Sequence, residues 1–319
     1  MSVGAVLVDP FDDQALRDLA ELAGIPVRRC ATWPFDLTPG ERVISTIPVP
    51  SVHAGRALGV VVREVLEPGL GEAWPARTVV LEDAASDVVA HLSGSFDPRG
   101  SLVAVVGTRG GIGTTSVAAA LARVLAEDPI AVALVDIDPV PRLRSLLGLA
   151  GGTTWGDLTG DAGPLLPHRL DASLPVWERV RVLTSDSRGG PRGRHGAALH
   201  ALACTHDTVV VDLGNRIEEV DAIGPAVCVV VLAAELPDVT GVSAVLGPPS
   251  EGRAVVPVVR PGSLSTEEVA FRLGIPVVPL GTERGGPAAS AHGSRPGDRP
   301  RGAVMKAARA VAKACREHA

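Results

Sequence analysis

The segment 101–126 constrains the fold of this 319-residue chain more than any other part of the sequence. An apolar run, SLVAVV, is followed by the glycine-rich turn GTRGGIG, and a stretch rich in Ala, Leu and Val begins at residue 114. This order predicts a buried strand, a tight loop and a helix. The backbone amides of such a loop converge on an anion, and its glycines let the backbone approach that anion closely. The segment therefore predicts a phosphate-binding loop.

Further apolar runs after the loop predict a doubly wound, parallel sheet. They are apolar throughout, as strands buried on both faces are. These runs lie at 130–135, 208–211, 226–233, 254–259 and 275–280. We expect this α/β domain to extend over residues 99–283.

A second, smaller α/β domain is predicted over residues 1–95. Short apolar runs alternate there with helical patterns, which is typical of a small parallel sheet. The strand-like runs lie at 3–8, 26–31, 42–47 and 78–81. The stretch SGSFDPRG at 93–100 has the composition of a linker between the two domains.

The distribution of tyrosine and lysine excludes one class of phosphate-binding enzyme. Gly107, Gly111 and Gly113 match the spacing of the dinucleotide loop in short-chain dehydrogenases, and the acidic segment 136–138 follows the next strand. That family needs a catalytic tyrosine and a nearby lysine. This chain has no tyrosine, and its two lysines lie in its last fourteen residues, at 306 and 313. The dehydrogenase interpretation is therefore rejected.

Three motifs instead resemble those of the ParA/MinD group of P-loop ATPases. The run RGGIGTTS at 109–116 resembles the deviant Walker A motif of that group, KGGxGKT[ST]. Asp138, in LVDIDP, resembles its second acidic motif, and Asp212, which ends TVVVD, resembles its Walker B aspartate. Each motif lies at the carboxyl end of a predicted strand, in the order that the group shows. The resemblance implies ATP and Mg²⁺ as ligands.

The resemblance also assigns roles to individual residues. The Thr115 hydroxyl would coordinate Mg²⁺, Asp212 would hold the ion through water, and Asp138 would position the attacking water. The expected nucleotide-binding set is Arg109, Gly110, Gly111, Ile112, Gly113, Thr114, Thr115, Ser116 and Asp136.

Two departures from the motif concern its lysines, which are replaced by Arg109 and Thr114. Loss of one charge-assisted contact costs about 1.5–3 kcal/mol, or about 10–100-fold in affinity. Hydrolysis should suffer more, because negative charge grows on the transferring phosphoryl group. Arg109 could partly replace a lysine, since a guanidinium binds phosphate in a bidentate manner. We expect ATP binding with at most weak ATPase activity.

A small residue at the P-loop lysine position is also found in the CpaE/TadZ branch of the group. Members of that branch carry a receiver-like domain before the ATPase-like domain. The segments 145–160 and 176–190 resemble actinobacterial members described as septum site-determining proteins or as CpaE-like proteins of helicase/secretion neighbourhoods. No aspartate ends the run 42–47, so the N-terminal domain is expected to be a pseudo-receiver.

The branch implies a homodimeric, nucleotide-controlled scaffold. It would act with protein partners in septum-site regulation or in positioning a type IV pilus-like (Tad) secretion system. Two alternatives stay open at this point. One is a genuine ATPase that cycles on and off the membrane, and the other is an interaction module whose nucleotide pocket is vestigial.

Cysteine usage and hydropathy indicate a cytoplasmic protein. The four cysteines form no CxxC pair, which favours a reducing compartment. The N-terminus lacks the basic region of a signal peptide, and the longest apolar run, 226–234, is too short to span a bilayer.

Residues 284–319 are expected to form a flexible basic tail that ends in a helix over 303–317. Eight basic and two acidic residues occur there, whereas the rest of the chain is acidic, which argues against sequence-specific nucleic-acid binding. The helix either packs on the domain or contacts the inner face of the cell membrane, as a C-terminal helix does in MinD relatives. Its apolar face consists of Val304, Met305, Ala308, Val311, Ala312 and Cys315.

Overall fold

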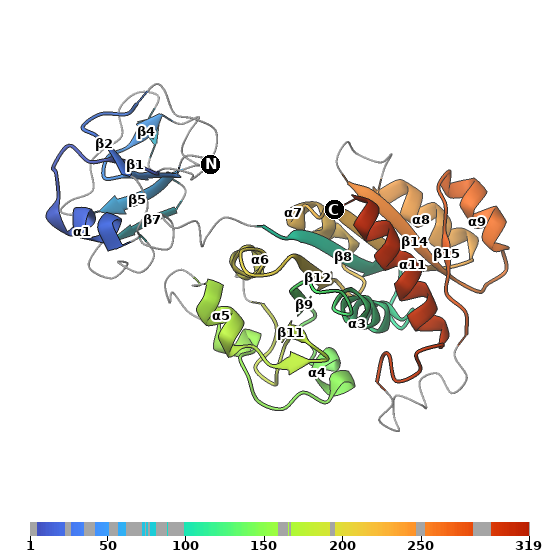
Figure 1. Ribbon diagram of the computed structural model, residues 1–319. Helices are drawn as coiled ribbons and strands as arrows, with labels where there is room; N and C mark the ends of the chain where they lie inside the picture. Colours follow the sequence, from blue (N-terminus) through green and yellow to red (C-terminus); the bar gives the residue numbers. More distant parts are fainter. Residues whose placement is uncertain are drawn as a thin grey trace. The chain divides into compact units, whose positions relative to one another are not determined.

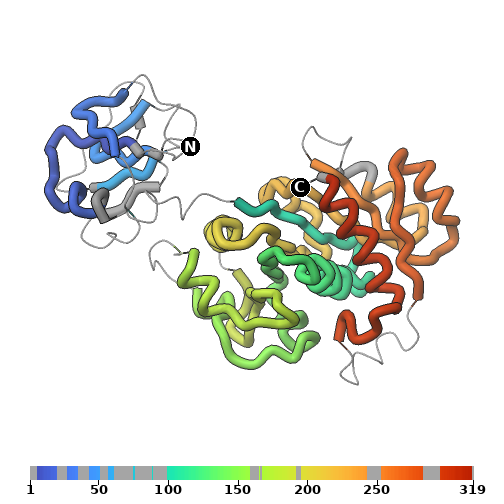
Figure 2. Tube along the Cα trace, in the orientation of Figure 1, coloured from blue at the N-terminus to red at the C-terminus, as the bar shows by residue number. Residues whose placement is uncertain are grey.

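The computed structural model separates the chain into two compact units, Met1–Asp97 and Pro98–Ala319. Figure 1 shows their elements, and Figure 2 traces the same chain as a tube. The structure describes residues 5–22, 27–34, 42–50, 57–61, 72–73, 75, 77–80, 88, 99–158, 165, 167–191, 195–246, 253–282 and 295–318. Most of the predicted linker, 93–98, lies outside these residues.

The N-terminal unit contains a five-stranded parallel sheet in the order β2-β1-β3-β5-β7. This is the flavodoxin-like order, whose reversal point lies between β1 and β3. The strands are β1 (Ala5–Val8), β2 (Val27–Cys30), β3 (Arg42–Ser45), β5 (Ala57–Val61) and β7 (Arg77–Val80). Two short strands, β4 (Val49–Pro50) and β6 (Glu72–Ala73), form a separate antiparallel pair. The small parallel α/β domain predicted from the sequence is thus present.

The residues of each strand alternate between the two faces of this sheet. Leu7, Ile44 and Leu58 pack on one face, together with Leu16 of α1 (Gln14–Leu22). Val6, Val8, Val43 and Ala57 pack on the other face. The Asp13 carboxylate caps α1 by accepting the amides of residues 15 and 16, at 2.9 and 3.3 Å.

The second unit contains an eight-stranded sheet in the order β10-β11-β9-β12-β8-β13-β14-β15. Only the β10–β11 pair is antiparallel among its described strands. The strands are β8 (Ser101–Gly107), β9 (Val132–Asp136), β10 (Val176–Trp177), β11 (Val180–Leu183), β12 (Thr208–Asp212), β13 (Val227–Ala233), β14 (Ala254–Arg260) and β15 (Val278–Pro279). The predicted doubly wound parallel sheet is confirmed, and the β10–β11 hairpin at its edge was not predicted.

Helices cover both faces of this sheet (Figure 1). α3 (Thr114–Leu125), α4 (Arg142–Leu147) and α11 (Ala303–His318) contribute to one hydrophobic cluster. α5 (Pro167–Ser173), α6 (His195–Ala203), α8 (Leu236–Leu246) and α9 (Thr266–Leu273) contribute to the other. The remaining elements are α7 (Val220–Ile223) and the 3₁₀ turns η2 (Trp155–Asp157) and η3 (Ile217–Glu219). Since apolar side chains cover both faces, the central strands β12 and β13 are buried along their whole length.

The terminal helix α11 packs along α3 inside this unit (Figure 2). Met305, Ala308, Val311 and Cys315 are each less than 5% exposed and belong to the same cluster as α3. This corrects the expected flexible tail at its helix, because α11 is an integral part of the P-loop unit. Of the two alternatives given for this helix, packing on the domain is the one seen here, with its apolar face buried. Among the described residues, none forms a helix long and apolar enough to cross a membrane.

Candidate functional site

Hydrogen bonds to β13 and to the segment after β12 position the glycine-rich loop between β8 and α3. The Gly107 amide donates to the Gly214 carbonyl (2.7 Å), and the Thr108 amide donates to the Val231 carbonyl (3.0 Å). A Cβ at Gly107 would lie 2.2 Å from Thr114 Oγ1, so only glycine fits there. Gly113 has a φ of 105°, in the left-handed region that glycine adopts without strain. The sequence therefore specifies the loop through sterics as well as through hydrogen bonds.

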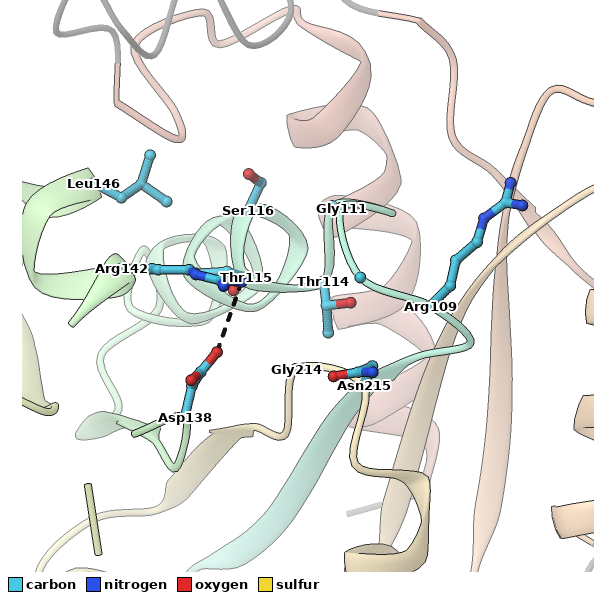
Figure 3. A pocket seen from close by; sticks show the side chains of 12 residues that line it. Arg109, Gly111, Thr114, Thr115, Ser116, Asp138, Arg142, Leu146, Gly214 and Asn215 are labelled. Atoms are coloured by element: carbon cyan, nitrogen blue, oxygen red, sulfur yellow. Dashed lines mark ion pairs between the residues drawn. The ribbon is translucent and has the colours of Figure 1, made fainter. Parts of the chain in front are cut away.

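The loop forms one side of a pocket of about 320 Å³ (Figure 3). Seven of its lining residues belong to the predicted nucleotide-binding set: Arg109, Gly110, Gly111, Gly113, Thr114, Thr115 and Ser116. Asp138 lines the pocket too. Ile112 and Asp136 do not line it, because Ile112 packs in the core beside α3 and Asp136 is buried at the end of β9. Asp212, predicted to hold Mg²⁺, is buried and does not line the pocket either. The predicted loop residues other than Ile112 thus line one pocket, and the binding roles assigned to them stay predictions.

Two predicted acidic residues meet at the carboxyl ends of adjacent strands. Asp136 on β9 and Asp212 on β12 are direct neighbours in the parallel register, and each is 1% exposed. Burial, together with the charge of Asp212, raises the pKa of Asp136 well above its usual value. Burial also raises the pKa of Asp212 to about 6. The strand ends therefore hold two carboxyl groups that are costly to ionise without a compensating positive charge.

Asp212 has one carboxylate oxygen without a protein partner. Its Oδ1 accepts the Gly214 amide at 3.0 Å, whereas its Oδ2 is buried and makes no hydrogen bond. The nearby Thr115 hydroxyl favours the charged form and lowers the pKa, but less than burial raises it. A buried polar atom without a partner is rare in folded proteins, and a ligand is one of its explanations.

Asp138 reaches the pocket from the segment that follows β9. Its amide donates to Asp136 Oδ1, and its own Oδ1 accepts the Val140 amide, each at 2.9 Å. The Ser185 hydroxyl donates to the Asp138 carbonyl. The side chain is 27% exposed, and Arg142 Nη1 lies 4.0 Å from its Oδ2. Asp138 is thus held by the backbone on one side and open to the pocket on the other.

The segments 145–160 and 176–190 contain residues that hold this acidic stretch in place. The Trp155 indole N–H donates to the Asp136 carbonyl at 2.6 Å, and the Thr184 hydroxyl donates to Asp136 Oδ2 at 3.1 Å. The Trp155 amide donates to the Thr184 carbonyl at 3.1 Å, which joins the two segments. The two segments therefore fix the backbone and side chain of Asp136, two residues before Asp138, and so help to position Asp138.

The two residues at the lysine positions differ in placement. Arg109 is 55% exposed, and its Nε lies 3.8 Å from Asp238 Oδ2. Figure 3 shows its side chain extending away from the other labelled residues. Thr114 is buried and has no charge. In this arrangement neither residue places a cation at the centre of the pocket.

Four residues that line the pocket were missed in the sequence. They are Arg142, Leu146, Gly214 and Asn215. All four follow a predicted acidic residue at a strand end, Asp138 or Asp212. Ligands of open α/β sheets bind beside the segments that follow the strands, so this rule was the signal that could have found them.

Comparison with curated sequences gives few relatives. No protein-family model matches the chain. Two proteins of Mycobacterium tuberculosis, from strains ATCC 25618 / H37Rv and CDC 1551 / Oshkosh, are both described as uncharacterized. Each is 32% identical in an alignment of 197 residues, and the match covers 56% of this chain and 53% of the relative. The chain spans about half the length of the curated relatives it matches.

Solved structures give broader similarity. A ParA family ATPase from Chlorobium tepidum TLS has a TM-score of 0.58 at 18% identity and covers 68% of this chain and 99% of its own. The fold is of the ParA/MinD P-loop type. The septum site-determining protein MinD of Pyrococcus horikoshii OT3, complexed with Mg-ADP, has a TM-score of 0.55 at 20% identity, with 69% and 98% coverage. The MinC:MinD complex of Aquifex aeolicus has a TM-score of 0.54 at 16% identity, with 66% and 95% coverage.

This ParA/MinD-type fold accounts for the position of the pocket. The strand order puts β8 between β12 and β13, so the P-loop and Asp212 lie on adjacent strands. Asp136 and the segment up to Asp138 follow on the next strand, β9. Three sequence motifs that are far apart in the chain are thereby brought to one edge of the sheet.

Proposed function

We propose that this chain binds ATP with Mg²⁺ and acts as a nucleotide-controlled spatial or scaffolding switch with weak or no hydrolysis. The observation that carries the proposal is the buried, unpartnered Oδ2 of Asp212. Asp212 interacts with the Thr115 hydroxyl, and Thr115 lines the P-loop pocket. A carboxylate and a hydroxyl at a phosphate-binding loop are the groups that a Mg–nucleotide site requires.

The donor set at this place fits Mg²⁺. This ion prefers oxygen ligands and usually keeps several of its waters, so few protein ligands are needed. Within the described residues, no group of three His, Cys, Asp or Glu side chains is arranged to hold a metal by itself. Thr115 and Asp212 would hold the ion, the latter through water, and the bound ion would neutralise phosphate charge.

The chain's own residues favour binding over hydrolysis. Gly110 and Gly111 have open space where a Cβ would lie, so a ligand can approach the loop backbone closely. Asp138 is oriented by the Val140 amide and open to the pocket, which suits it to orient a water molecule. The cationic contribution of the two motif lysines is missing, however, and that contribution matters most in the transition state.

The biological role is proposed from the kinds of protein that share the fold. They include a ParA family ATPase, a septum site-determining protein bound to Mg-ADP and a MinC:MinD complex. For this chain, we infer membership of the CpaE/TadZ branch, a homodimer, and protein partners in septum-site regulation or in a type IV pilus-like (Tad) secretion system. The N-terminal unit would serve as a pseudo-receiver for such partners. The protein would work in the cytoplasm or at the inner face of the cell membrane.

Binding is tested with a fluorescent ATP analogue, titrated with Mg²⁺ and with a chelator. We expect saturable, Mg²⁺-dependent binding by the full chain. Thr114→Lys should tighten it by about 10–100-fold, because it restores one charge-assisted phosphate contact. Thr114→Gln is the matched control, since it adds a polar side chain without a charge. Absence of saturable binding at millimolar nucleotide would leave only an interaction module with a vestigial pocket.

Hydrolysis is tested by steady-state phosphate release. We expect release by the wild-type chain to be close to background and to rise in Thr114→Lys. Clear release by the wild-type chain that disappears in Asp138→Ala would contradict the weak-hydrolysis proposal and favour the genuine, membrane-cycling ATPase.

A further inference from the structure

The pocket has lost the positive charge that its loop motif normally supplies. Thr114 carries no charge, and Arg109 is turned toward Asp238. A polyphosphate bound in this pocket still needs cationic partners, because several negative charges would otherwise be desolvated together. A substitute cation would come from another element that lines the same pocket.

Arg142 is such a cation. It is the first residue of α4 and lines the pocket together with Thr115 and Ser116. Figure 3 shows its side chain extending from α4 toward Thr115, with the ion pair to Asp138 drawn as a dashed line. Arg109 and Arg142 are the basic residues among those that line the pocket. Arg142 pairs with Asp138 of the acidic motif, whereas Figure 3 shows Arg109 extending away from the other labelled residues.

The ion pair between Arg142 and Asp138 is weak. The distance from Arg142 Nη1 to Asp138 Oδ2 is 4.0 Å, and the Arg142 side chain is 68% exposed. Exposed ion pairs at this separation contribute little in water. Asp138 does not depend on Arg142 for its orientation, because the Val140 amide binds its other oxygen at 2.9 Å. Arg142 can therefore leave Asp138 without disturbing the acidic segment.

A guanidinium gains from exchanging a long carboxylate pair for a phosphate. Its planar N–H groups match two phosphate oxygens at once, and charge-assisted bonds of this kind are stronger than a pair at 4.0 Å. The exchange would therefore strengthen triphosphate binding, which is the role proposed for this pocket.

We infer that Arg142 is the phosphate-binding cation of this pocket and replaces the missing P-loop lysine by moving from Asp138 to the terminal phosphate of a nucleoside triphosphate. The inference rests on the proposed nucleotide-binding function and names the residue that recognises the triphosphate. It places the phosphate cation on α4, which follows Asp138, instead of in the loop itself.

The test measures the affinity of the full chain for a fluorescent ATP analogue with Mg²⁺, and for adenosine as a competitor. Arg142→Gln should weaken triphosphate binding by about 10–100-fold and leave adenosine binding unchanged. Arg142→Lys should keep most of the wild-type affinity, since it keeps the positive charge and loses only the bidentate geometry of the guanidinium. Arg169→Gln is the matched control, because Arg169 is exposed on α5 and does not line the pocket.

The same substitution is also made in the Asp138→Asn variant. This distinguishes a direct contact of Arg142 with phosphate from a role in which Arg142 only neutralises the Asp138 carboxylate. If Arg142 binds phosphate, Arg142→Gln should weaken binding at least as much in Asp138→Asn as in the wild-type chain, because the competing carboxylate is then absent. A loss that vanishes in Asp138→Asn would overturn the inference, because Arg142 would then only mask a repulsive carboxylate. Unchanged binding by Arg142→Gln, with saturable binding by the wild-type chain, would overturn the inference alone. Absence of saturable wild-type binding would remove the proposed function as well.

Discussion

Both units place carboxylates at the carboxyl ends of parallel strands, but their oxygens are satisfied differently. In the N-terminal unit, Asp9 follows β1 at the point where the strand order reverses. Its Oδ1 accepts the Phe11 amide and the Thr46 hydroxyl at 3.1 and 3.0 Å, and its Oδ2 accepts the Asp13 amide at 2.6 Å. Both oxygens of Asp9 are thus engaged by the protein itself.

In the second unit, Asp212 occupies the equivalent kind of position but keeps Oδ2 without a partner. It is also more deeply buried than Asp9, and burial raises its pKa to about 6. Such a carboxylate lowers the stability of the free protein unless a cation compensates for it. A carboxylate at a strand end therefore indicates a ligand site when one of its oxygens lacks a hydrogen-bond partner in the protein. It has a structural role when the protein supplies hydrogen bonds to both oxygens.

The largest effect is expected from removing the charge at Asp212. Asp212→Asn should weaken Mg²⁺-dependent binding of the ATP analogue by about 100-fold, because outer-shell ligands of a metal contribute on this scale. Asp9→Asn is the matched substitution in the other unit and should leave that affinity unchanged. Equal losses in the two variants, measured in the same titration, would break the comparison.

Removing the same charge should weaken ligand binding but increase the folding stability of the ligand-free protein. The folded-state pKa of Asp212, about 6, lies above the value near 4 of the unfolded chain. Its contribution to stability is therefore fully present below about pH 4 and is lost as the pH rises through about 6. At about pH 7.5, Asp212→Asn should raise the free energy of unfolding of the second unit by about 2 kcal/mol.

Acidification supplies the check on this second prediction. At about pH 5 the wild-type carboxyl is largely protonated in the folded state, so its difference from Asp212→Asn should shrink by about 1 kcal/mol. Urea titrations without nucleotide or Mg²⁺, read by pulse proteolysis, would separate the two units by fragment size. If the difference in the free energy of unfolding between the two proteins stayed constant with pH, ionisation of Asp212 would not lower the stability of the folded unit.

The sheet of the second unit was predictable because its central strands are buried on both faces. Such strands appear in the sequence as uninterrupted apolar runs, and β8, β9, β12, β13 and β14 each overlap a predicted run. The acidic residues at the ends of β9 and β12 were found for the same reason, since the end of a run marks the edge of the sheet. The P-loop was found from its glycines.

The remaining features depend on contacts that one sequence does not display. Helical periodicity identified the apolar face of α11 but not its partner, and the partner is the alanine-rich surface of α3. The hairpin β10–β11 lies at the edge of the sheet, where Val176 is 55% exposed, so it lacks the apolar run of a central strand. Arg142 carries no motif of its own and enters the site only because α4 folds beside the loop.

The smallest effect is expected from the hydroxyl that satisfies Asp9. Thr46 is 3% exposed, and its Oγ1 donates to Asp9 Oδ1 at 3.0 Å. Thr46→Val keeps the shape and removes the donor, so it should lower the stability of the N-terminal unit by about 1–2 kcal/mol. Thr46→Ser keeps the donor and serves as the control, with pulse proteolysis of the N-terminal fragment as the measurement. Because Asp9 has a structural role in this account, Thr46→Val should leave nucleotide affinity unchanged, and a change in that affinity would show that the satisfied carboxylate also belongs to a functional site.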